Sequence, residues 1–308
     1  MIHPCFTLDD SYATTRLLTT QRPTIRNNPD SKLQTALFLP PNPGRKGEWG
    51  LRTKGYFKQG FKEKPLVSVI TVVLNGERHL EKTIQSVISQ TYDNLEYIII
   101  DGGSTDSTLD IIAKYENTID YCVSEADEGI SDAFNKGITC SLGQLIGIIN
   151  SDDWYEQDAV SINITNFDRI ACFSFGICTY IKSNGEKVDL LPDQNYHKKI
   201  KYWMPQIHTP TVFVKKRIYQ TFGLFDYSLK YAMDYDFFLR LYKNNCVGTA
   251  LPNKIAYMRM QGASNKFYFE VRREVRKISI RYGVSPPVAH ICCMLLLLKY
   301  ILYSKNKW

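Results

Sequence analysis

Apolar positions are scattered through the first 64 residues, and sustained hydrophobic stretches begin abruptly at Pro65. The early segment is rich in Pro, Gly, Asn and Arg, and its run PPNPGRKGEWGLRTKG is typical of turns and loops. We therefore expect residues 1–64 to form an extended N-terminal arm that leads into a folded domain, with a poorly ordered tail as the alternative.

Strands alternate with helices in the next part of the sequence. The β-branched run LVSVITVVLN at 66–75 is long enough for a strand buried on both faces, and the amphipathic segment 77–90 follows it as a helix. The run LEYIIID predicts a second buried strand that ends on Asp101. Strands alternating with helices indicate a mostly parallel sheet with helices on both faces. Further helices are expected at 109–117 and 132–139, and further strands at 121–124 and 144–150.

The pattern changes after Trp154. A hairpin is expected to turn at 183–185, because its Asn-Gly pair readily adopts the positive φ angles of a tight turn. The following segments predict a strand at 210–214, helices at 215–223 and 234–245, and a last strand at 249–260. We thus predict an α/β catalytic domain at 65–265, with a nucleotide-binding half at 65–154 and an acceptor half at 155–265.

Composition narrows the class of protein. The chain has 308 residues, of which 44% are hydrophobic and 22% are charged, so it can bury a full core, and this excludes wholesale disorder and fibrous classes. Its eight cysteines form no CxxC pair and mostly lie in apolar runs, which predicts buried, reduced thiols in a cytoplasmic protein. The first residues lack the basic start and apolar stretch of a secretory signal.

The charge is unevenly distributed. Residues 1–64 carry a net charge of +6, residues 65–265 carry −6, and residues 266–308 carry +7. An acidic centre argues against a nucleic-acid partner, and the basic ends favour an anionic surface. The apolar run at 288–303 is shorter than the ~20 residues of a spanning helix. We expect a helical C-terminal extension at 266–308 lying on an anionic inner membrane leaflet, with packing on the domain or on a second copy as alternatives.

Carboxylates follow two of the predicted strands. Asp101 ends one strand, and Asp152 and Asp153 come directly after another. Ligands of open parallel sheets bind at the carboxyl ends of the strands, so these acids are expected to share one crevice. Such a cluster either holds a hard divalent cation or does acid–base work. The structural alternative is that each acid only caps a turn.

Five motifs occur in one order along residues 65–265: SVITVVLN, DGGSTDST, SEADEGISDAFNKGI, NSDDW and MDYDFFLRL. Together they resemble the family 2 glycosyltransferases with the GT-A fold, whose members use nucleotide-activated sugars to build bacterial polysaccharides. No GxGxxG follows the first strand, which argues against a dinucleotide-dependent dehydrogenase.

The resemblance implies a donor site on the first loops. Leu74, Asn75 and Glu77 would flank the nucleotide base, and Asp101 would accept a hydrogen bond from the imide N–H of that base. Asp127 would lie near the ribose and the diphosphate. An imide suits uracil or thymine, so a UDP-sugar is the expected donor.

A metal site is also implied by the resemblance. The run 150–153 matches the family's DxD-type element, with Asp152 expected to bind Mg²⁺ or Mn²⁺ and Asp153 expected to support the metal, water or donor sugar. The first acid of the usual triplet is Asn150 here, which removes one negative charge from the site. The cation would neutralise the departing nucleotide diphosphate.

The acceptor side of the resemblance begins at the helix 234–245. Asp234 matches the general base that takes the proton of the acceptor hydroxyl, although the usual preceding Glu is Met233. Asp236 is the reserve base, and an ion pair with Arg240 is its plainer role. His208 matches a histidine that would line the acceptor or diphosphate site, with a structural histidine as the alternative. A turn at 262–264 would belong to a loop that closes over the donor.

The sequence therefore predicts an inverting, metal-assisted glycosyltransferase that transfers a sugar to a glycan or lipid-linked acceptor in cell-surface polysaccharide synthesis. Two alternatives stay open. A nucleotidyltransferase also places acids at strand ends, although LNGERHLEK is a poor glycine-rich phosphate loop. A catalytically silent nucleotide-sugar-binding or scaffold subunit would explain Asn150 and Met233. The oligomeric state is left open.

Overall fold

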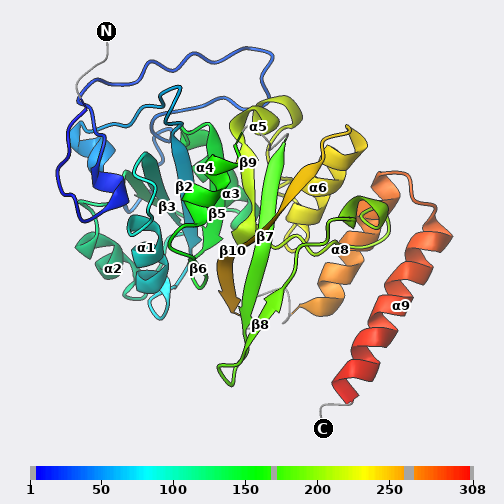
Figure 1. Cartoon of the computed structure of the whole chain (residues 1–308). Coiled ribbons are helices and arrows are strands. Elements are labelled where there is room, and N and C mark those ends of the chain that lie inside the picture. Colours follow the sequence, from blue (N-terminus) through cyan, green and yellow to red (C-terminus); the bar gives the residue numbers. More distant parts are fainter. Residues whose placement is uncertain (1–4, 168–171, 260–266, 306–308) are drawn as a thin grey trace.

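The computed structural model describes residues 5–167, 172–259 and 267–305, and a mixed sheet forms its centre (Figure 1). The strand order is β1-β4-β3-β2-β5-β9-β7-β10-β6, with β8 paired to β7 off this path. The strands are β1 (Gly47–Trp49), β2 (Val67–Val73), β3 (Leu95–Asp101), β4 (Tyr121–Ser124), β5 (Leu145–Asn150), β6 (Trp154–Tyr155), β7 (Phe173–Ile181), β8 (Lys187–Leu190), β9 (Phe213–Lys215) and β10 (Gly248–Arg259).

Four parallel strands, in the order β4-β3-β2-β5, bring their carboxyl ends to one edge of the sheet. The register places Asp101 beside Val73 and Ser124, and Asn150 beside Val72. The second half joins through β9, which runs antiparallel to both β5 and β7. The predicted α/β fold with a mostly parallel sheet is confirmed, and so is the position of the acids at one edge.

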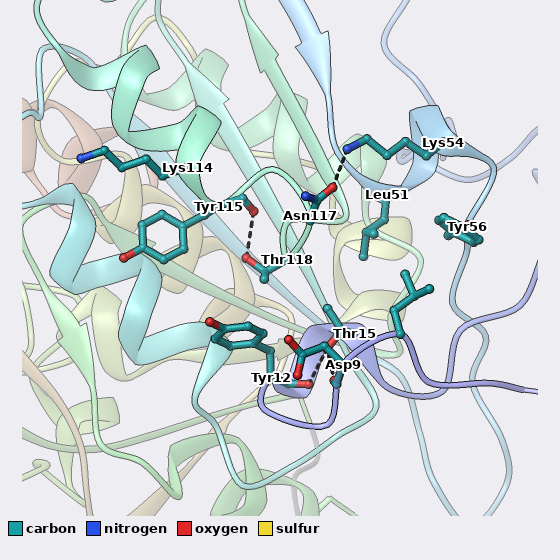
Figure 2. Close-up of a pocket in the computed structure, with 11 residues that line it drawn as sticks. Asp9, Tyr12, Thr15, Leu51, Lys54, Tyr56, Lys114, Tyr115, Asn117 and Thr118 are labelled. Atoms are coloured by element: carbon teal, nitrogen blue, oxygen red, sulfur yellow. Dashed lines mark hydrogen bonds between the residues drawn. The ribbon is translucent and has the colours of Figure 1, made fainter.

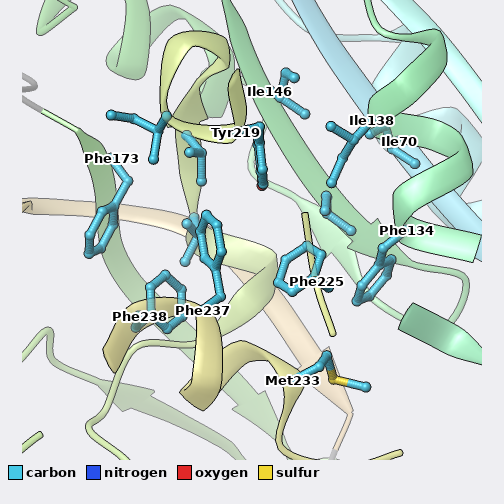
Figure 3. Packing of buried hydrophobic residues seen from close by; sticks show 14 of the residues in the cluster. Ile70, Phe134, Ile138, Ile146, Phe173, Tyr219, Phe225, Met233, Phe237 and Phe238 are labelled. Carbon is cyan, nitrogen blue, oxygen red and sulfur yellow. The ribbon is translucent and has the colours of Figure 1, made fainter. Parts of the chain in front are cut away.

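Helices cover both faces of the sheet, and β2 shows why its run is apolar throughout. Val69 packs in one core cluster, with residues of α1 (Leu80–Ile88), α2 (Thr108–Lys114) and α4 (Ala159–Thr165). Its neighbour Ile70 packs in the other cluster, with residues of α3 (Ile130–Cys140), α5 (Lys216–Phe222), α6 (Met233–Lys243) and α8 (Tyr268–Arg281). This second cluster is strongly aromatic around Phe173, Phe225 and Phe237 (Figure 3).

The N-terminal arm packs against the domain. Strand β1 pairs antiparallel with β4, and the buried Arg52 forms an ion pair with Glu96 of β3. Lys58 is also buried, and its Nζ donates a hydrogen bond to the carbonyl of Arg16 over 2.6 Å. The alternative of a poorly ordered tail is therefore wrong for residues 5–64. Where the arm passes the end of α2, a cavity of about 420 Å³ lies between them (Figure 2).

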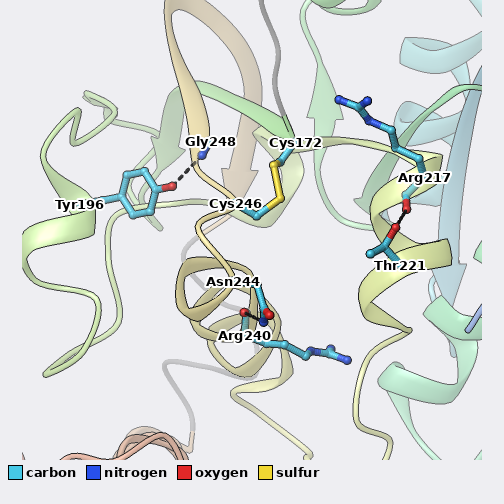
Figure 4. Close-up of a disulfide and its surroundings, with 8 residues drawn as sticks. All are labelled: Cys172, Tyr196, Arg217, Thr221, Arg240, Asn244, Cys246 and Gly248. Carbon is cyan, nitrogen blue, oxygen red and sulfur yellow. Dashed lines mark hydrogen bonds between the residues drawn. A yellow bond between two sulfur atoms is a disulfide. The ribbon is translucent and has the colours of Figure 1, made fainter.

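Two cysteines correct the expectation of reduced thiols. Cys172 and Cys246 form a disulfide that joins the start of β7 to the segment before β10 (Figure 4). Strands β7 and β10 run in parallel and pair Phe173 with Gly248. Cys172 and Cys246, which are 74 residues apart in the sequence, therefore lie close together just before the two strands. Sequence spacing alone carries no signal of such a pair. Cys5, Cys122, Cys140, Cys178, Cys292 and Cys293 are free thiols.

The C-terminal segment folds into α8 and α9 (Pro286–Lys305), in agreement with the helical extension predicted at 266–308. Helix α9 packs on α8, where the Tyr268 hydroxyl donates to the carbonyl of Leu296 over 3.3 Å. Within the described residues, no helix has the length and apolarity to cross a membrane. The predicted loop turn at 262–264 lies outside the described residues.

Candidate functional site at the carboxyl ends of the strands

Asp101 anchors the loop that follows β3. It is fully buried, and its two oxygens accept hydrogen bonds from the Ser124 hydroxyl at 2.6 Å, from the backbone N–H groups of Gly103 and Ser104 at 3.0 Å, and from the Ser104 hydroxyl. A carboxylate that accepts several such bonds fixes its loop firmly. The predicted contact between Asp101 and a nucleotide base stays a prediction.

The loop after β2 is tied to the loop after β3 by two polar side chains. Asn75 has a positive φ of 53°, a conformation that asparagine tolerates better than most residues, and its Oδ1 accepts the N–H of Thr105 at 2.8 Å. Glu77 accepts the N–H of Ser107 through its carboxylate at 3.0 Å. Two of the predicted base-flanking residues thus support the loops, while Leu74 stays 59% exposed.

Leu74, Gly102 and Asp127 converge on one point. A Cβ added to Gly102 would lie 2.5 Å from Oδ2 of Asp127 and 3.6 Å from Cδ1 of Leu74. The Oδ1 of Asp127 accepts the N–H of Gly129 at the start of α3, which holds the carboxylate in place. The structure therefore brings two predicted donor-site residues together across a glycine, where a larger residue would collide with Asp127.

Asp152 and Asp153 differ in their surroundings. Asp153 is 2% exposed, and its carboxylate accepts hydrogen bonds from Nδ2 of Asn150 at 3.3 Å and from the N–H of Arg259 at 3.1 Å. Burial, together with the neighbouring Asp152, raises the pKa of Asp153 well above its usual range. Asp152 is half-exposed at the edge of the sheet. The two predicted metal ligands therefore face different environments.

The donor set fits a divalent cation through few protein ligands. Asn150 keeps its Oδ1 buried and without a hydrogen-bond partner, and the Asp152 carboxylate lies two residues further along the same loop. Among the described residues, no group of three or more His, Cys, Asp and Glu side chains could hold a metal. Mg²⁺ commonly binds through one or two protein oxygens and takes its remaining ligands from phosphates and water. Asp152 and Asn150 are compatible with that mode.

Cations gather beside these acids. Lys82 of α1 lies with its Nζ 3.3 Å from the ring centre of Trp154, and the Arg259 guanidinium lies 5.1 Å from the same ring. In the part of the chain that the structure describes, neither cation forms an ion pair. Burial and the charges of Arg259 and Arg78 lower the pKa of His79, which also lies in the field of Asp152. This group suits a polyanion.

Asp234 occupies the second half of the site, near the start of α6. Its Oδ1 accepts the N–H of Tyr235 at 2.7 Å, and its Oδ2 accepts the Thr209 hydroxyl at 3.4 Å. It borders a narrow apolar pocket that includes Val212, Phe225 and Phe237. Burial in these surroundings raises the pKa of Asp234 to about 6. The carboxylate is thus a stronger base than an ordinary aspartate.

Asp236 is placed differently from Asp234. It is 3% exposed, and its carboxylate lies 3.8 Å from the Arg240 guanidinium and 3.4 Å from the Arg281 guanidinium of α8. The expected ion pair with Arg240 is confirmed. These contacts join α6 to α8, so the packing of the two helices already uses this carboxylate.

His208 and Tyr180 connect the two groups of acids. The Tyr180 hydroxyl lies 3.2 Å from Nδ1 of His208, and Nε2 of His208 is buried without a partner among the described atoms. Burial lowers the pKa of His208 to about 4, so the ring is neutral at physiological pH. Burial raises the pKa of Tyr180, and the charges of Asp153 and Asp234 act on it as well. Tyr180 therefore lies in the electrostatic field of acids from both halves of the site.

Sequence reasoning missed Tyr180, Lys82 and Arg259. Tyr180 comes from the hairpin strand β7, which carried no motif, and Lys82 sits on an ordinary amphipathic helix. Of these three residues, Arg259 could have been identified from the sequence. It ends β10 and comes directly before the segment predicted to close over the donor.

Comparison with known proteins decides the family. The model of glycosyl transferase family 2 matches residues 68–222, which is half of the chain. The chain belongs to glycosyl transferase family 2. The match includes the loops at Asn75, Asp101, Asp127 and Asp152, as well as His208, and it ends before Asp234.

Individual relatives agree with this assignment. An uncharacterized glycosyltransferase of Rickettsia prowazekii is 32% identical over 191 residues, which cover 58% of this chain and 59% of that protein. The putative teichuronic acid biosynthesis glycosyltransferase TuaG of Bacillus subtilis is 33% identical over 130 residues, covering 41% of this chain and 52% of TuaG. The chain thus spans about three fifths of the length of the first of these relatives and about half of the second.

Solved structures share the fold. TarS of S. aureus, solved with UDP-GlcNAc, superposes with a TM-score of 0.55 at 19% identity, covering 75% of this chain and 71% of that one. The mannosyltransferase PcManGT of Pyrobaculum calidifontis, solved with GDP-Man and Mn²⁺, gives 0.55 at 16% identity, covering 75% and 68%. At this identity the likeness establishes the fold alone.

Proposed function

We propose that this chain is an inverting glycosyltransferase that moves a sugar from a nucleotide diphosphate donor to a hydroxyl of a glycan or lipid-linked acceptor, in cell-surface polysaccharide synthesis. The observation that carries the proposal is Asp234, a carboxylate at the edge of an apolar pocket with its pKa raised to about 6. Membership of family 2 supports the reaction class. Residues 65–154 would bind the donor and residues 155–265 the acceptor, with the arm at 1–64 and the extension at 266–308 outside this domain.

Asp234 would act as the general base. At neutral pH most of it is ionised, and its raised pKa gives it a greater affinity for the acceptor proton than a surface aspartate has. The Thr209 hydroxyl and the Tyr235 N–H hold its two oxygens in place. The acceptor oxygen would attack the anomeric carbon as its proton passes to Asp234, while the bond to the phosphate oxygen breaks on the opposite face. The configuration would invert.

The departing diphosphate needs positive charge. Asp152 and the Oδ1 of Asn150 would hold a divalent cation, which would supply Lewis-acid stabilisation when bound. Lys82 and Arg259 add two protein cations beside the same loop. We propose that these side chains share the neutralisation, since Asn150 brings no charge of its own. Neutral His208 would line the same space through its unpaired Nε2.

The nucleotide would lie over the loops at Leu74 and Gly102. The exposed Leu74 side chain offers an apolar surface for a base, and Asp127 lies across the glycine, where it would meet the ribose or the diphosphate. Asp101, Asn75 and Glu77 would hold this surface in shape. The donor is proposed to be a UDP-sugar, as the family resemblance implies, and TarS, which shares the fold, is solved with UDP-GlcNAc.

Calorimetric titration of UDP tests the donor site. We expect micromolar binding in the presence of Mn²⁺, about −8 kcal/mol, and weaker binding after chelation and in Asp152→Asn. Uridine, which lacks the diphosphate, serves as the matched ligand: Arg259→Ala and Lys82→Ala should weaken UDP about tenfold and leave uridine unchanged. Failure of UDP, GDP and dTDP to bind under all conditions would overturn the proposal.

Turnover separates the remaining alternatives. We expect the wild-type enzyme to hydrolyse a UDP-sugar slowly to UDP. If Asp234 also activates the attacking water, Asp234→Asn should abolish this hydrolysis. Binding without turnover of any UDP-sugar, in the presence of acceptor extracts, would favour a silent nucleotide-sugar-binding subunit. Release of pyrophosphate from a nucleoside triphosphate would favour a nucleotidyltransferase.

Helix α9 would place the enzyme on a membrane surface. Four apolar side chains at helical spacing, Ile291, Met294, Leu295 and Leu298, are each more than half exposed. The adjacent α8 carries the exposed cations Arg273 and Lys277. An apolar stripe beside basic residues suits an anionic leaflet. Cosedimentation with phosphatidylglycerol vesicles should exceed that with phosphatidylcholine vesicles and should be lost in Met294→Asp/Leu298→Asp. Equal binding to both vesicle types would contradict the proposal.

A further inference from the structure

The cavity between the N-terminal arm and α2 lies away from the site at the strand ends. It is about 420 Å³ in volume and is formed by the N-terminal arm, by the turn Leu51–Lys54, and by the end of α2 (Figure 2). Helix α2 runs back from the carboxyl end of β3, so its last residues lie at the amino edge of the sheet, just before β4 begins. The cavity is therefore on the opposite edge from Asp101 and Asp152. Its volume is typical of a small-molecule site.

Three tyrosines from three separate segments line this cavity. Tyr12 lies near the start of the arm, Tyr56 follows the turn after β1 near the end of the arm, and Tyr115 directly follows α2. All three are half-buried and line the cavity (Figure 2). The Tyr115 hydroxyl is already bonded to Glu81 and Gln85, so this residue offers a ligand only its ring. A tyrosine ring offers an apolar face together with a polar hydroxyl, a combination that suits ligands with both kinds of surface.

Polar groups of both signs surround the rings. Asp9 uses Oδ1 to accept the N–H of Ser11 at 2.7 Å, and this hydrogen bond lowers the pKa of its carboxyl, which leaves an ionised acceptor at the cavity. Lys54 is held by Glu116 at 2.7 Å and by Asn117 at 2.6 Å, so its charge is already neutralised. Lys114 also lines the cavity, so among the described lining residues its positive charge stands opposite the ionised Asp9, while Lys54 is paired with Glu116. These charges nearly balance, which does not favour a phosphate or another strong anion. Mixed donors and acceptors favour a neutral ligand with many hydroxyl groups.

We propose that this cavity binds a saccharide unit, as a glycan-holding site separate from the transfer site. The C–H face of a sugar ring would pack on the tyrosine rings, while its hydroxyl groups would pair with Asp9, Asn117 and the Lys54 ammonium. The choice of a saccharide over other polyols rests on the proposed function. A glycan held here would keep its reactive end near the enzyme and so raise its effective concentration.

The arm thereby gains a role beyond packing. Leu8, Asp9, Tyr12 and Thr15 of the arm supply one wall, and they reach the cavity because the arm folds back along the sheet edge. The adjacent backbone is well tied, with the N–H of Leu8 bonded to the carbonyl of Thr15 at 3.0 Å. The site would therefore be present before a ligand arrives.

A printed array of defined bacterial and animal glycans tests the proposal on the full chain. We expect the wild-type protein to bind a subset of the glycans, and Tyr56→Ala and Asp9→Asn to reduce that signal at least tenfold. Asp9→Asn keeps the carbonyl oxygen that accepts the Ser11 N–H, so the local fold should survive. The matched controls are Asp10→Asn, next to Asp9 but outside the cavity, and Tyr227→Ala, a tyrosine that is 64% exposed elsewhere. Both should bind as the wild type does.

Two further experiments distinguish binding at the cavity from binding at the transfer site. Binding should persist with saturating UDP and Mn²⁺ and in Asp234→Asn, because these affect only the transfer site. No glycan bound, binding unchanged in both cavity variants, or binding lost only in Asp234→Asn would overturn the inference. UDP calorimetry on the same preparations tests the proposed function by itself. UDP binding without glycan binding would contradict only the glycan site. Glycan binding without UDP binding would contradict only the transfer function.

Discussion

The donor-side loops and the acceptor-side residues differ in how their polar groups are used. Asp101, Asn75 and Glu77 accept hydrogen bonds from the loop after β3, and Asp101 also accepts one from Ser124, so these side chains mainly hold the donor loops together. On the acceptor side, His208 has a buried nitrogen without a partner, and Asp234 has a pKa raised to about 6. Buried polar groups are normally satisfied, so the exceptions point to where a ligand would complete the site.

The contrast suggests a division of labour. The donor loops are preorganised by their own hydrogen bonds, so a nucleotide would bind without much ordering of the protein. The acceptor side keeps its base in a partly apolar environment, which costs stability and makes the group reactive. Substitutions in the donor loops should then lower stability, whereas substitutions on the acceptor side should lower the rate of transfer. The following variants test this difference.

The largest effect is expected for Asp234→Asn. The amide keeps the shape but cannot take a proton, so transfer should fall by about 10²–10⁴-fold, the usual contribution of a general base. UDP affinity should stay unchanged. Asp236→Asn is the matched control, because that carboxylate pairs with Arg240 and Arg281; it should lower the melting temperature and leave the rate of the folded fraction nearly intact. Equal rate losses in the two variants would contradict the division.

Most of the fold could be read from the sequence, and the reason is local. The runs that became β2, β3 and β5 are apolar on both faces, so their period and length identify buried strands without any tertiary information. Asp101 and Asp152 were found in the same way, because each adjoins a strand end, whereas Asp234 was identified through the family resemblance. The predicted places of these residues in the fold are borne out, whereas their roles in catalysis stay predictions.

Long-range partners could not be read from the sequence. Arg52 and Glu96 are 44 residues apart, and only the fold brings the arm against β3. The disulfide of Cys172 and Cys246 depends on the parallel pairing of β7 with β10. Tyr180 and Arg259 likewise reach the site through strands that lack motifs. Each is set by tertiary packing, which a single sequence does not encode in any local pattern.

Substitutions that loosen the donor side should lower the free energy of unfolding. Arg52→Met removes one member of a fully buried ion pair and leaves Glu96 of β3 without its counter-charge, held by hydrogen bonds from Ser68, Leu142 and Gly143. We expect this to cost about 3–5 kcal/mol of unfolding free energy. Chemical denaturation measures this directly. Lys54→Met is the control, since its pair with Glu116 is exposed and should contribute less than about 1 kcal/mol. A loss below 1 kcal/mol in Arg52→Met would mean that the arm does not support the sheet.

Asp101→Asn should give an intermediate effect. The amide nitrogen would face the hydroxyl and N–H donors that the carboxylate now accepts, so the loop should lose about 1–3 kcal/mol. UDP affinity should fall about tenfold as the loop loses its shape. Ser124→Ala removes one of those bonds and should show the same change at smaller size. Normal UDP affinity in a destabilised Asp101→Asn would separate the loop from the nucleotide.

The smallest effect is expected in the dependence of kcat/KM on pH, on the acidic side of the profile. Because burial raises the pKa of Asp234 to about 6, its basic form is lost as the pH falls through 6, and kcat/KM should then drop tenfold per unit. His208, with its pKa lowered to about 4, stays neutral over the same window and does not contribute. This drop should vanish from the residual activity of Asp234→Asn. If it persists there, another group titrates, and the acceptor side does not owe its reactivity to Asp234.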